Sequence, residues 1–216
     1  MPQGRNLTRG EESLCQHVFR KSINLRNIEV VKRPKTMHFG GFTPYGRVNM
    51  DGNAYEEDYI GEDMFNPPDV WAAHHFLHEV SHSWQHFVGM GMLHHFRLAQ
   101  KGGRDVRKAN GMPFRPAGMK LKDWRSIKFD SVYSYDITSA TDLLDFSMEQ
   151  QCDIIADYFA LKLGWMTTAP AKAFGHPIPT QAQLHGVLRN FLADPAYVRD
   201  QKPVNEMRAR YRMVER

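Results

Sequence analysis

Apolar residues recur at helical spacing in two long stretches of the chain. The first runs from Val70 to Val88 with no Pro or Gly inside it, and Asp69 stands in front of it as a capping residue. The second covers residues 147–164. Its apolar members are Phe146, Ile154, Ile155, Tyr158, Phe159 and Leu161. A period of three to four residues over such lengths predicts two amphipathic helices with buried faces.

The N-terminal part begins with a marked helix and continues as short strands. Thr8 and Glu11 have the spacing of a capping box, and apolar residues at helical spacing follow them, which predicts a helix over residues 9–22. Residues 28–33 are typical of a strand that ends before Pro34. The turn residues of the segment 39–57 then favour a hairpin, with strand-like pieces around Val48 and Tyr55.

The remaining patterns are weaker. Residues 132–137, VYSYDI, alternate like a short strand, and Thr180 begins a capped helix that reaches Leu192. We therefore expect an α+β fold, mainly helical, with a small sheet or hairpin beside the helix of residues 70–88. We expect one domain over residues 1–216. Its parts are an N-terminal helix and sheet (1–70), two long helices with an insertion (71–165) and a helical extension (166–216).

Composition narrows the class of protein. A chain of 216 residues with 42% hydrophobic content can bury a core, and its net charge of +4 favours anionic partners without indicating a specific nucleic acid. No apolar run is long enough to span a bilayer, and the N-terminus lacks the apolar core of a secretory signal. We therefore expect a protein that is cytoplasmic in its producer and is not exported by the Sec pathway. Cys15 and Cys152 are expected to be reduced.

The first long helix contains the pattern HExxH at His78, Glu79 and His82. Residues four apart lie on one face of a helix about 6 Å apart along its axis, so both imidazoles can bind one metal ion. Glu79 points about 100° away from them and can reach a water molecule on that metal, which is the position of a general base. His75 and His86 lie near the same stripe, and we interpret them as packing or supporting residues.

A catalytic zinc ion usually has three protein ligands and a water molecule, so a third ligand is required. Glu149, on the second long helix, is the best candidate, and Asp153 lies on the same helical face four residues later. Asp145 and Asp157 are the next candidates. Cys152 is expected to be a buried packing residue, because a fourth protein ligand would close the site.

These motifs resemble the gluzincin clan of zinc metallopeptidases, in which a Glu on a second helix completes the site. The resemblance implies that His78, His82 and Glu149 hold one Zn²⁺ per chain, that Glu79 is the base, and that Asp153 hydrogen-bonds a zinc-bound histidine. It also implies a zincin-like fold whose edge strand lines the cleft. The segment between the two helices is longer than in compact members of the clan, which is a departure from the pattern.

Two features of that insertion have open interpretations. Residues 101–128 contain nine Lys or Arg with interleaved Gly and Pro, which predicts a long irregular loop or hairpin. It is either a solvated surface or a lid that attracts an anionic substrate. Tyr133 and Tyr135 follow it, and Tyr135 is our candidate donor to the oxyanion that develops during hydrolysis. The alternative for either tyrosine is aromatic core packing.

A closer resemblance is to Vgr-related or Rhs-associated bacterial proteins linked to type VI secretion. It rests on HEVSHSWQH at 78–86, YSYD at 133–136 and LLDFSMEQQCDIIADYF at 143–159. It implies a toxin effector that hydrolyses peptide bonds of protein or of peptidoglycan stem peptides, exported by type VI secretion, with a secretion-apparatus carrier or an immunity protein as partner. The alternative is a non-catalytic, zinc-stabilised module of a secretion apparatus or effector carrier.

Overall fold

The structure is a computed structural model. It describes residues 4–33, 41–43, 46–90, 103–105, 107–108, 111–112, 117–137, 140, 142–170 and 177–200. The strands are β1 (Gly4–Asn6), β2 (Glu29–Arg33), β3 (Gly41–Phe42) and β4 (Arg47–Asp51). The α-helices are α1 (Arg9–Phe19), α2 (Val70–Phe87), α4 (Leu121–Tyr133), α5 (Met148–Lys162), α6 (Gln181–Val187) and α7 (Arg189–Ala193). The 3₁₀ turns are η1 (Leu25–Asn27), η2 (Leu143–Asp145) and η4 (Tyr197–Asp200). The predicted α+β class, mainly helical with a small sheet, is confirmed.

The strands form one four-stranded sheet in the order β1-β2-β4-β3. A hairpin is present in the predicted segment, but its strands are β3 and β4 and not the pieces expected around Val48 and Tyr55. Strands β2 and β4 are parallel and place Val30 beside Val48. The strand expected around Tyr55 is absent from the described sheet. A turn follows Asp51 instead, in which the backbone N–H of Ala54 donates to Asp51.

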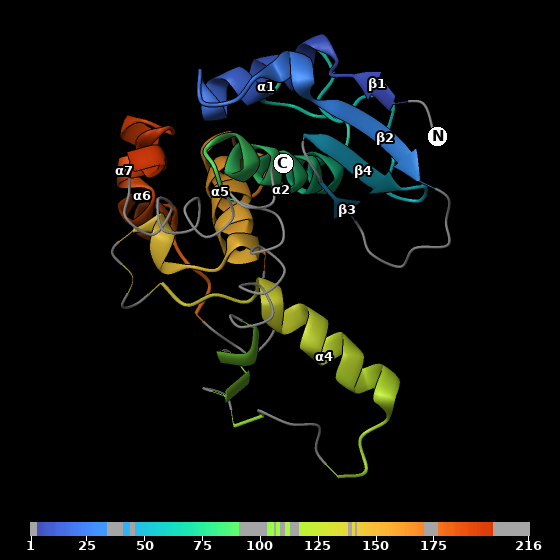
Figure 1. The fold of residues 1–216 in the computed structure, drawn as a ribbon, viewed down its shortest axis with the longest axis vertical. Helices are drawn as coiled ribbons and strands as arrows, with labels where there is room; N and C mark the ends of the chain where they lie inside the picture. The colour runs from blue at the N-terminus through green and yellow to red at the C-terminus, as the bar shows by residue number, and fades with distance from the viewer. Residues whose placement is uncertain are drawn as a thin grey trace, which may run out of the picture.

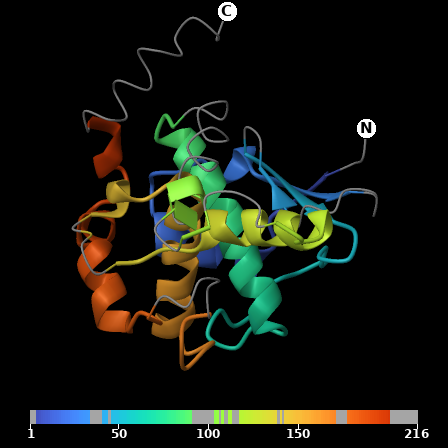
Figure 2. The same ribbon diagram turned by 90° about the horizontal axis from the view of Figure 1, so that it is seen from below.

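The long helices α2 and α5 lie between the sheet and the C-terminal helices (Figures 1 and 2). In Figure 1, α1 and the sheet occupy one end of the molecule and α4 lies at the other. Both long helices begin as their sequences predict. Asp69 accepts hydrogen bonds from the backbone N–H groups of Trp71 and Ala72, and the backbone N–H of Ser147 donates to the side chain of Gln150.

Aromatic side chains join the N-terminal helix, α2 and the C-terminal helices in one core. The ring of Trp84 on α2 lies 6.4 Å from that of Phe19 and 5.1 Å from that of Phe191 on α7. Its indole N–H donates to the carbonyl of Pro195 at 2.9 Å, which satisfies the polar atom of a fully buried ring. The last turn of α2, beyond the HExxH motif, is thereby fixed from two sides.

The segment before α5 differs from our prediction. Residues 121–128 belong to helix α4, not to the irregular loop or hairpin expected over 101–128, and Val132 and Tyr133 end that helix instead of beginning a strand. Leu121, Trp124 and Ile127 recur every three residues, a helical signal that the many charges had obscured. Within the described ranges, no helix is both long enough and apolar enough to cross a membrane. The basic tail after residue 200 lies outside them.

Candidate metal centre

The histidines of the HExxH motif and Glu149 meet where α2 packs against α5. The Nε2 atoms of His78 and His82 lie 3.3 Å and 3.1 Å from the same oxygen, Oε2 of Glu149. All three side chains are largely buried, with 6%, 10% and 14% of their side-chain surface exposed. Two imidazole nitrogens and one carboxylate oxygen therefore converge on one point. This donor set matches the His₂Glu set of catalytic zinc sites.

The other ring nitrogen of each histidine has a partner of its own. Nδ1 of His78 lies 2.8 Å from Oδ1 of Asp153, and Nδ1 of His82 lies 2.9 Å from Oε1 of Gln85. The amide nitrogen of Gln85 in turn donates to the carbonyl of Met148 and to Gln151 on the neighbouring helix. An acceptor on Nδ1 fixes the proton there, so that Nε2 presents a lone pair to a metal ion.

Acidic side chains surround the rings of His78 and His82 and favour a positive charge there. Burial disfavours protonation of His78, but the carboxylates of Asp153 and Glu149 outweigh it, so its pKa is raised well above the ordinary range. Burial also disfavours protonation of His82. The carboxylates of Glu149 and Glu79 outweigh this effect, so the pKa of His82 is raised to about 9. A cation between the rings and Glu149 would be stabilised by the same carboxylates.

Glu79, the predicted base, has a hydrogen-bond donor from another part of the fold. Glu79 is buried, with 4% of the residue exposed, and its Oε2 accepts a hydrogen bond of 2.8 Å from the hydroxyl of Thr43. Thr43 follows β3, which is an edge strand of the sheet. The sheet thus contributes directly to the orientation of Glu79.

Cys152 lies at the same centre and is fully buried, as expected. Its Sγ atom is 3.2 Å from Nδ1 of His82, and the potential ligand atoms of His78, His82 and Cys152 lie within 4.8 Å of one another. The described residues therefore also provide a possible His/His/Cys metal site. Glu149 faces the Nε2 edges of both rings, whereas Cys152 lies on the Nδ1 side of His82, which Gln85 already occupies.

The two candidate tyrosines occupy different places. The hydroxyl of Tyr135 donates to Oδ2 of buried Asp157 at 2.5 Å, while the ring of Tyr133 lies 5.7 Å from that of His78. Burial, together with Glu149 and Glu79, raises the pKa of Tyr133, which keeps its hydroxyl protonated and able to donate. The role assigned to Tyr135 as oxyanion donor stays a prediction, and Tyr133 is the tyrosine beside the histidines.

The sequence predictions did not include several of the contacts around the centre. Gln85 lies three residues after His82 on the same helix, a spacing that could have indicated it. Thr43 had no such signal, because it is brought to Glu79 by the sheet. His75 stacks on His78 with 6.4 Å between ring centroids, and His86 contacts Phe87. Asp145, the alternative ligand, instead forms the capping box of η2 with Asp142.

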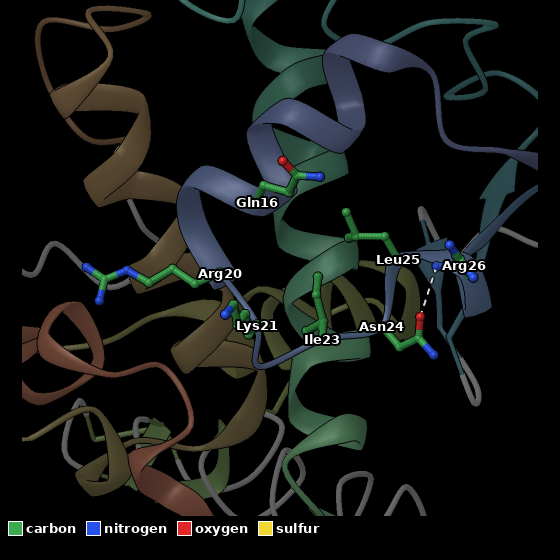
Figure 3. Close-up of a pocket in the computed structure, with 7 residues that line it drawn as sticks. All are labelled: Gln16, Arg20, Lys21, Ile23, Asn24, Leu25 and Arg26. Atoms are coloured by element: carbon green, nitrogen blue, oxygen red, sulfur yellow. Dashed lines mark hydrogen bonds between the residues drawn. The ribbon is translucent and has the colours of Figure 1, made fainter.

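A separate open hollow lies at the C-terminal end of α1 (Figure 3). Its volume is about 620 Å³, and it is lined by Gln16, Arg20, Lys21, Ile23, Asn24, Leu25 and Arg26. Arg20 donates to the carbonyls of Leu192 and Ala193, so it joins α1 to α7. The hollow contains none of the predicted site residues. Arg20 and Lys21 lie at the C-terminus of α1, where their charges complement the helix dipole.

Comparison with known proteins finds one similar protein and one similar solved structure. It is 25% identical over 197 residues to the type VI secretion system spike protein VgrG2b of Pseudomonas aeruginosa, a match that covers 87% of this chain and 15% of that protein. The chain thus corresponds to a small part of the relative it matches. A solved structure, the effector domain of Pseudomonas aeruginosa VgrG2b, matches with a TM-score of 0.48 and 23% identity, covering 88% of this chain and 82% of that one. No protein-family model matches the chain.

Proposed function

We propose that this protein is a zinc-dependent hydrolase that cleaves peptide bonds and acts as a type VI secretion effector. The observation that carries the proposal is the convergence of Nε2 of His78 and Nε2 of His82 on Oε2 of Glu149. His78, His82 and Glu149 would hold the zinc ion. Bound zinc supplies an activated water molecule and polarises the carbonyl of the substrate.

The remaining chemistry belongs to residues of the chain. Glu79 accepts the proton of the attacking water and later returns it to the leaving amine. The hydrogen bond from Thr43 holds one oxygen of Glu79 and leaves the other for this proton. Tyr133, whose ring lies beside His78, would donate a hydrogen bond to the developing oxyanion in place of Tyr135, whose hydroxyl is bonded to Asp157. The short edge strand β3, next to Thr43, is available to pair with an extended peptide.

Similarity to the spike protein VgrG2b supports the secretion part of the proposal. A carrier in the secretion apparatus would deliver the protein, and an immunity protein would protect the producer. The substrate is a peptide-like chain, either protein or a peptidoglycan stem peptide, since both contain carbonyls that activated water can attack.

Substitution Glu79→Gln tests the enzymatic function. Gln keeps the size of Glu and can still accept from Thr43, but it cannot take a proton from water. We expect zinc content and thermal stability to be retained and hydrolysis to fall by about 10²- to 10⁴-fold. Cleavage of a mixed peptide library and digestion of purified peptidoglycan provide the rates, and the assay that responds identifies the substrate class.

The control for this test is Glu12→Gln, on the exposed side of α1 and outside the centre. It is expected to match the wild type in zinc content and in hydrolysis. If wild type and Glu79→Gln were equal in both hydrolysis assays, the enzymatic proposal would be wrong.

One observation favours a second function, a non-catalytic module in which zinc joins two helices. Cys152 is close enough to His78 and His82 to complete a closed set of protein ligands, which is typical of structural zinc sites. We favour the enzyme, because a structural site has no use for Glu79 and because Nδ1 of His82 is held by Gln85. The two functions are separated by the substitutions of Glu79 and Cys152.

A further inference from the structure

Three pairs of one histidine and one acidic residue connect α2 and α5 at successive helical turns. His82 faces Glu149 at 3.1 Å, and His78 faces Asp153 at 2.8 Å. The third pair continues the series one turn away from the metal centre. It consists of His74 and Asp157, with 2.6 Å between Nε2 and Oδ1. Each step of four residues back along α2 is matched by a step of four forward along α5, as antiparallel helices require.

The third pair is more deeply buried than a surface ion pair and has a third member. Asp157 is 0% exposed, Tyr135 is 2% exposed and His74 is 8% exposed. The carboxylate accepts from Nε2–H of His74 through Oδ1 and from the hydroxyl of Tyr135 through Oδ2. Both oxygens of a buried anion are therefore satisfied, by one donor from α2 and one from the segment after α4.

A buried polar group of this kind is not needed for the stability of a core. Apolar side chains of the same volume commonly stabilise a protein as well as a buried polar pair does, because burial of a charge removes its hydration. What a directional pair adds is a fixed relative position of the elements that it joins. Here it fixes one turn of α2, the facing turn of α5 and residue 135.

Each of these three segments also carries a residue of the metal centre, within about one helical turn of its member of the third pair. His74 is one turn before His78, Asp157 is one turn after Asp153, and Tyr135 is two residues after Tyr133, whose ring contacts His78. A shift at the third pair is therefore transmitted to the ligands over a single helical turn.

We propose that His74, Asp157 and Tyr135 are positioning residues for the metal centre, which hold α2, α5 and the Tyr133 segment in the register that metal binding requires. The proposal rests on the proposed zinc site, and none of the three residues touches the metal. Their removal changes the affinity and geometry of the metal site, and not only the stability of the fold.

The test compares two Tyr→Phe substitutions in the full chain. Tyr135→Phe removes the donor to Asp157. Tyr197→Phe removes a comparable donor, the hydroxyl that donates to Asp142 at 2.6 Å, and none of the described hydrogen bonds joins Tyr197 or Asp142 to the proposed ligands. The readouts are the zinc dissociation constant, from competition with a chromophoric chelator, and the visible absorption bands of the cobalt-substituted protein. We expect Tyr135→Phe to weaken zinc binding about tenfold, in the range of partners that orient metal ligands, and to shift the cobalt bands.

Tyr197→Phe is expected to lower thermal stability with an unchanged zinc affinity and an unchanged cobalt spectrum. If Tyr135→Phe does not fold, His74 supplies the second comparison. His74→Gln keeps an N–H donor near the position of Nε2 and is expected to retain the affinity, whereas His74→Leu loses it.

The outcomes distinguish this proposal from the one on which it rests. A wild-type protein that binds no zinc contradicts the zinc site and the positioning role together. A wild-type protein that binds zinc, with Tyr135→Phe or His74→Leu folded and unchanged in affinity and cobalt spectrum, contradicts the positioning role alone. Equal losses of affinity in Tyr135→Phe and Tyr197→Phe also overturn it, because the effect would then follow stability.

Discussion

At the scale of single residues, the centre is defined by which atom of each side chain points inward. Both histidines turn Nε2 toward Glu149 because Asp153 and Gln85 hold their Nδ1 atoms. Cys152 has a suitable donor atom but lies on the Nδ1 side of His82. Ligand identity is therefore a question of ring orientation, which single substitutions can resolve.

Loss of Glu149 is expected to remove most of the zinc affinity. Glu149→Gln replaces the charged oxygen that faces both Nε2 atoms with a neutral amide. Asp145→Asn changes the alternative ligand, which accepts from the backbone N–H of Asp142 in the capping box of η2. We expect Glu149→Gln to lower affinity by more than the roughly 10- to 100-fold that is typical of outer partners of metal ligands. Zinc content by mass spectrometry and chelator competition measure it. Zinc retained in Glu149→Gln but lost in Asp145→Asn would reverse the assignment.

Cys152→Ala is expected to leave zinc binding unchanged. The substitution removes a buried sulfur, which costs on the order of 1 kcal/mol of stability through the small cavity that remains. Cys15→Ala is the matched control, because Cys15 is equally buried and lies outside the centre. Both variants should lose similar stability and keep one zinc per chain. A selective loss of zinc in Cys152→Ala would support the structural module instead of the enzyme.

At the scale of elements, α1 is held against the loop that leads to α2. Thr8 at its N-terminus donates to Asp58, and the same carboxylate accepts from the backbone N–H groups of Ile60 and Gly61. Gly10 lies against this loop. A Cβ atom added there would be 1.8 Å from the carbonyl oxygen of Gly61.

Gly10→Ala is therefore expected to destabilise the protein, although Ala is the better helix former. The backbone of Gly61 must move, and overpacking of this kind costs about 1–3 kcal/mol. Gly186→Ala is the control, since it lies in α6 with nothing within 4 Å of its added Cβ, and it should stabilise by roughly 0.5–1 kcal/mol. Chemical denaturation of both variants measures whether each substitution raises or lowers the free energy of unfolding. A stabilised Gly10→Ala would show that α1 is not packed against Gly61 in this way.

At the scale of the whole molecule, the metal centre joins parts that are distant in the chain. Thr43 comes from beside the sheet, Glu79 from α2, Tyr133 from the end of α4 and Glu149 from α5. A metal ion at this point would bind only the folded chain, because the unfolded chain does not bring these groups together.

Zinc is consequently expected to raise the melting temperature. A ligand at about 100 times its dissociation constant adds about 2.7 kcal/mol to the free energy of unfolding. For a chain of this size, each kcal/mol shifts the transition by about 2–4 °C, so the expected rise is roughly 5–11 °C. Differential scanning calorimetry with zinc and with a chelator measures it. The His78→Ala/His82→Ala double variant should show no shift, and an equal shift in that variant would place the zinc elsewhere.

Much of the fold and of the centre could be predicted from local patterns. The capping boxes at Thr8 and Thr180, the cap at Asp69 and the spacing of His78 and His82 depend on neighbours within one helical turn. The family resemblance implied that Asp153 hydrogen-bonds one of the zinc-bound histidines, and Glu149 was identified from its place in a second helical segment and its four-residue spacing from Asp153. In these cases the interacting residues are close in sequence, or the family resemblance supplies the arrangement.

The remaining features were decided by tertiary packing. Parallel pairing of β2 with β4, the approach of Thr43 to Glu79, and the choice of Tyr133 or Tyr135 beside the histidines all depend on distant segments. The acidic residues 149, 153 and 157 were visible in the sequence, but their pairing with His82, His78 and His74 needs the antiparallel register of two helices. A sequence specifies which faces are apolar and where helices begin; which polar groups then meet is decided by the packing of those faces against each other.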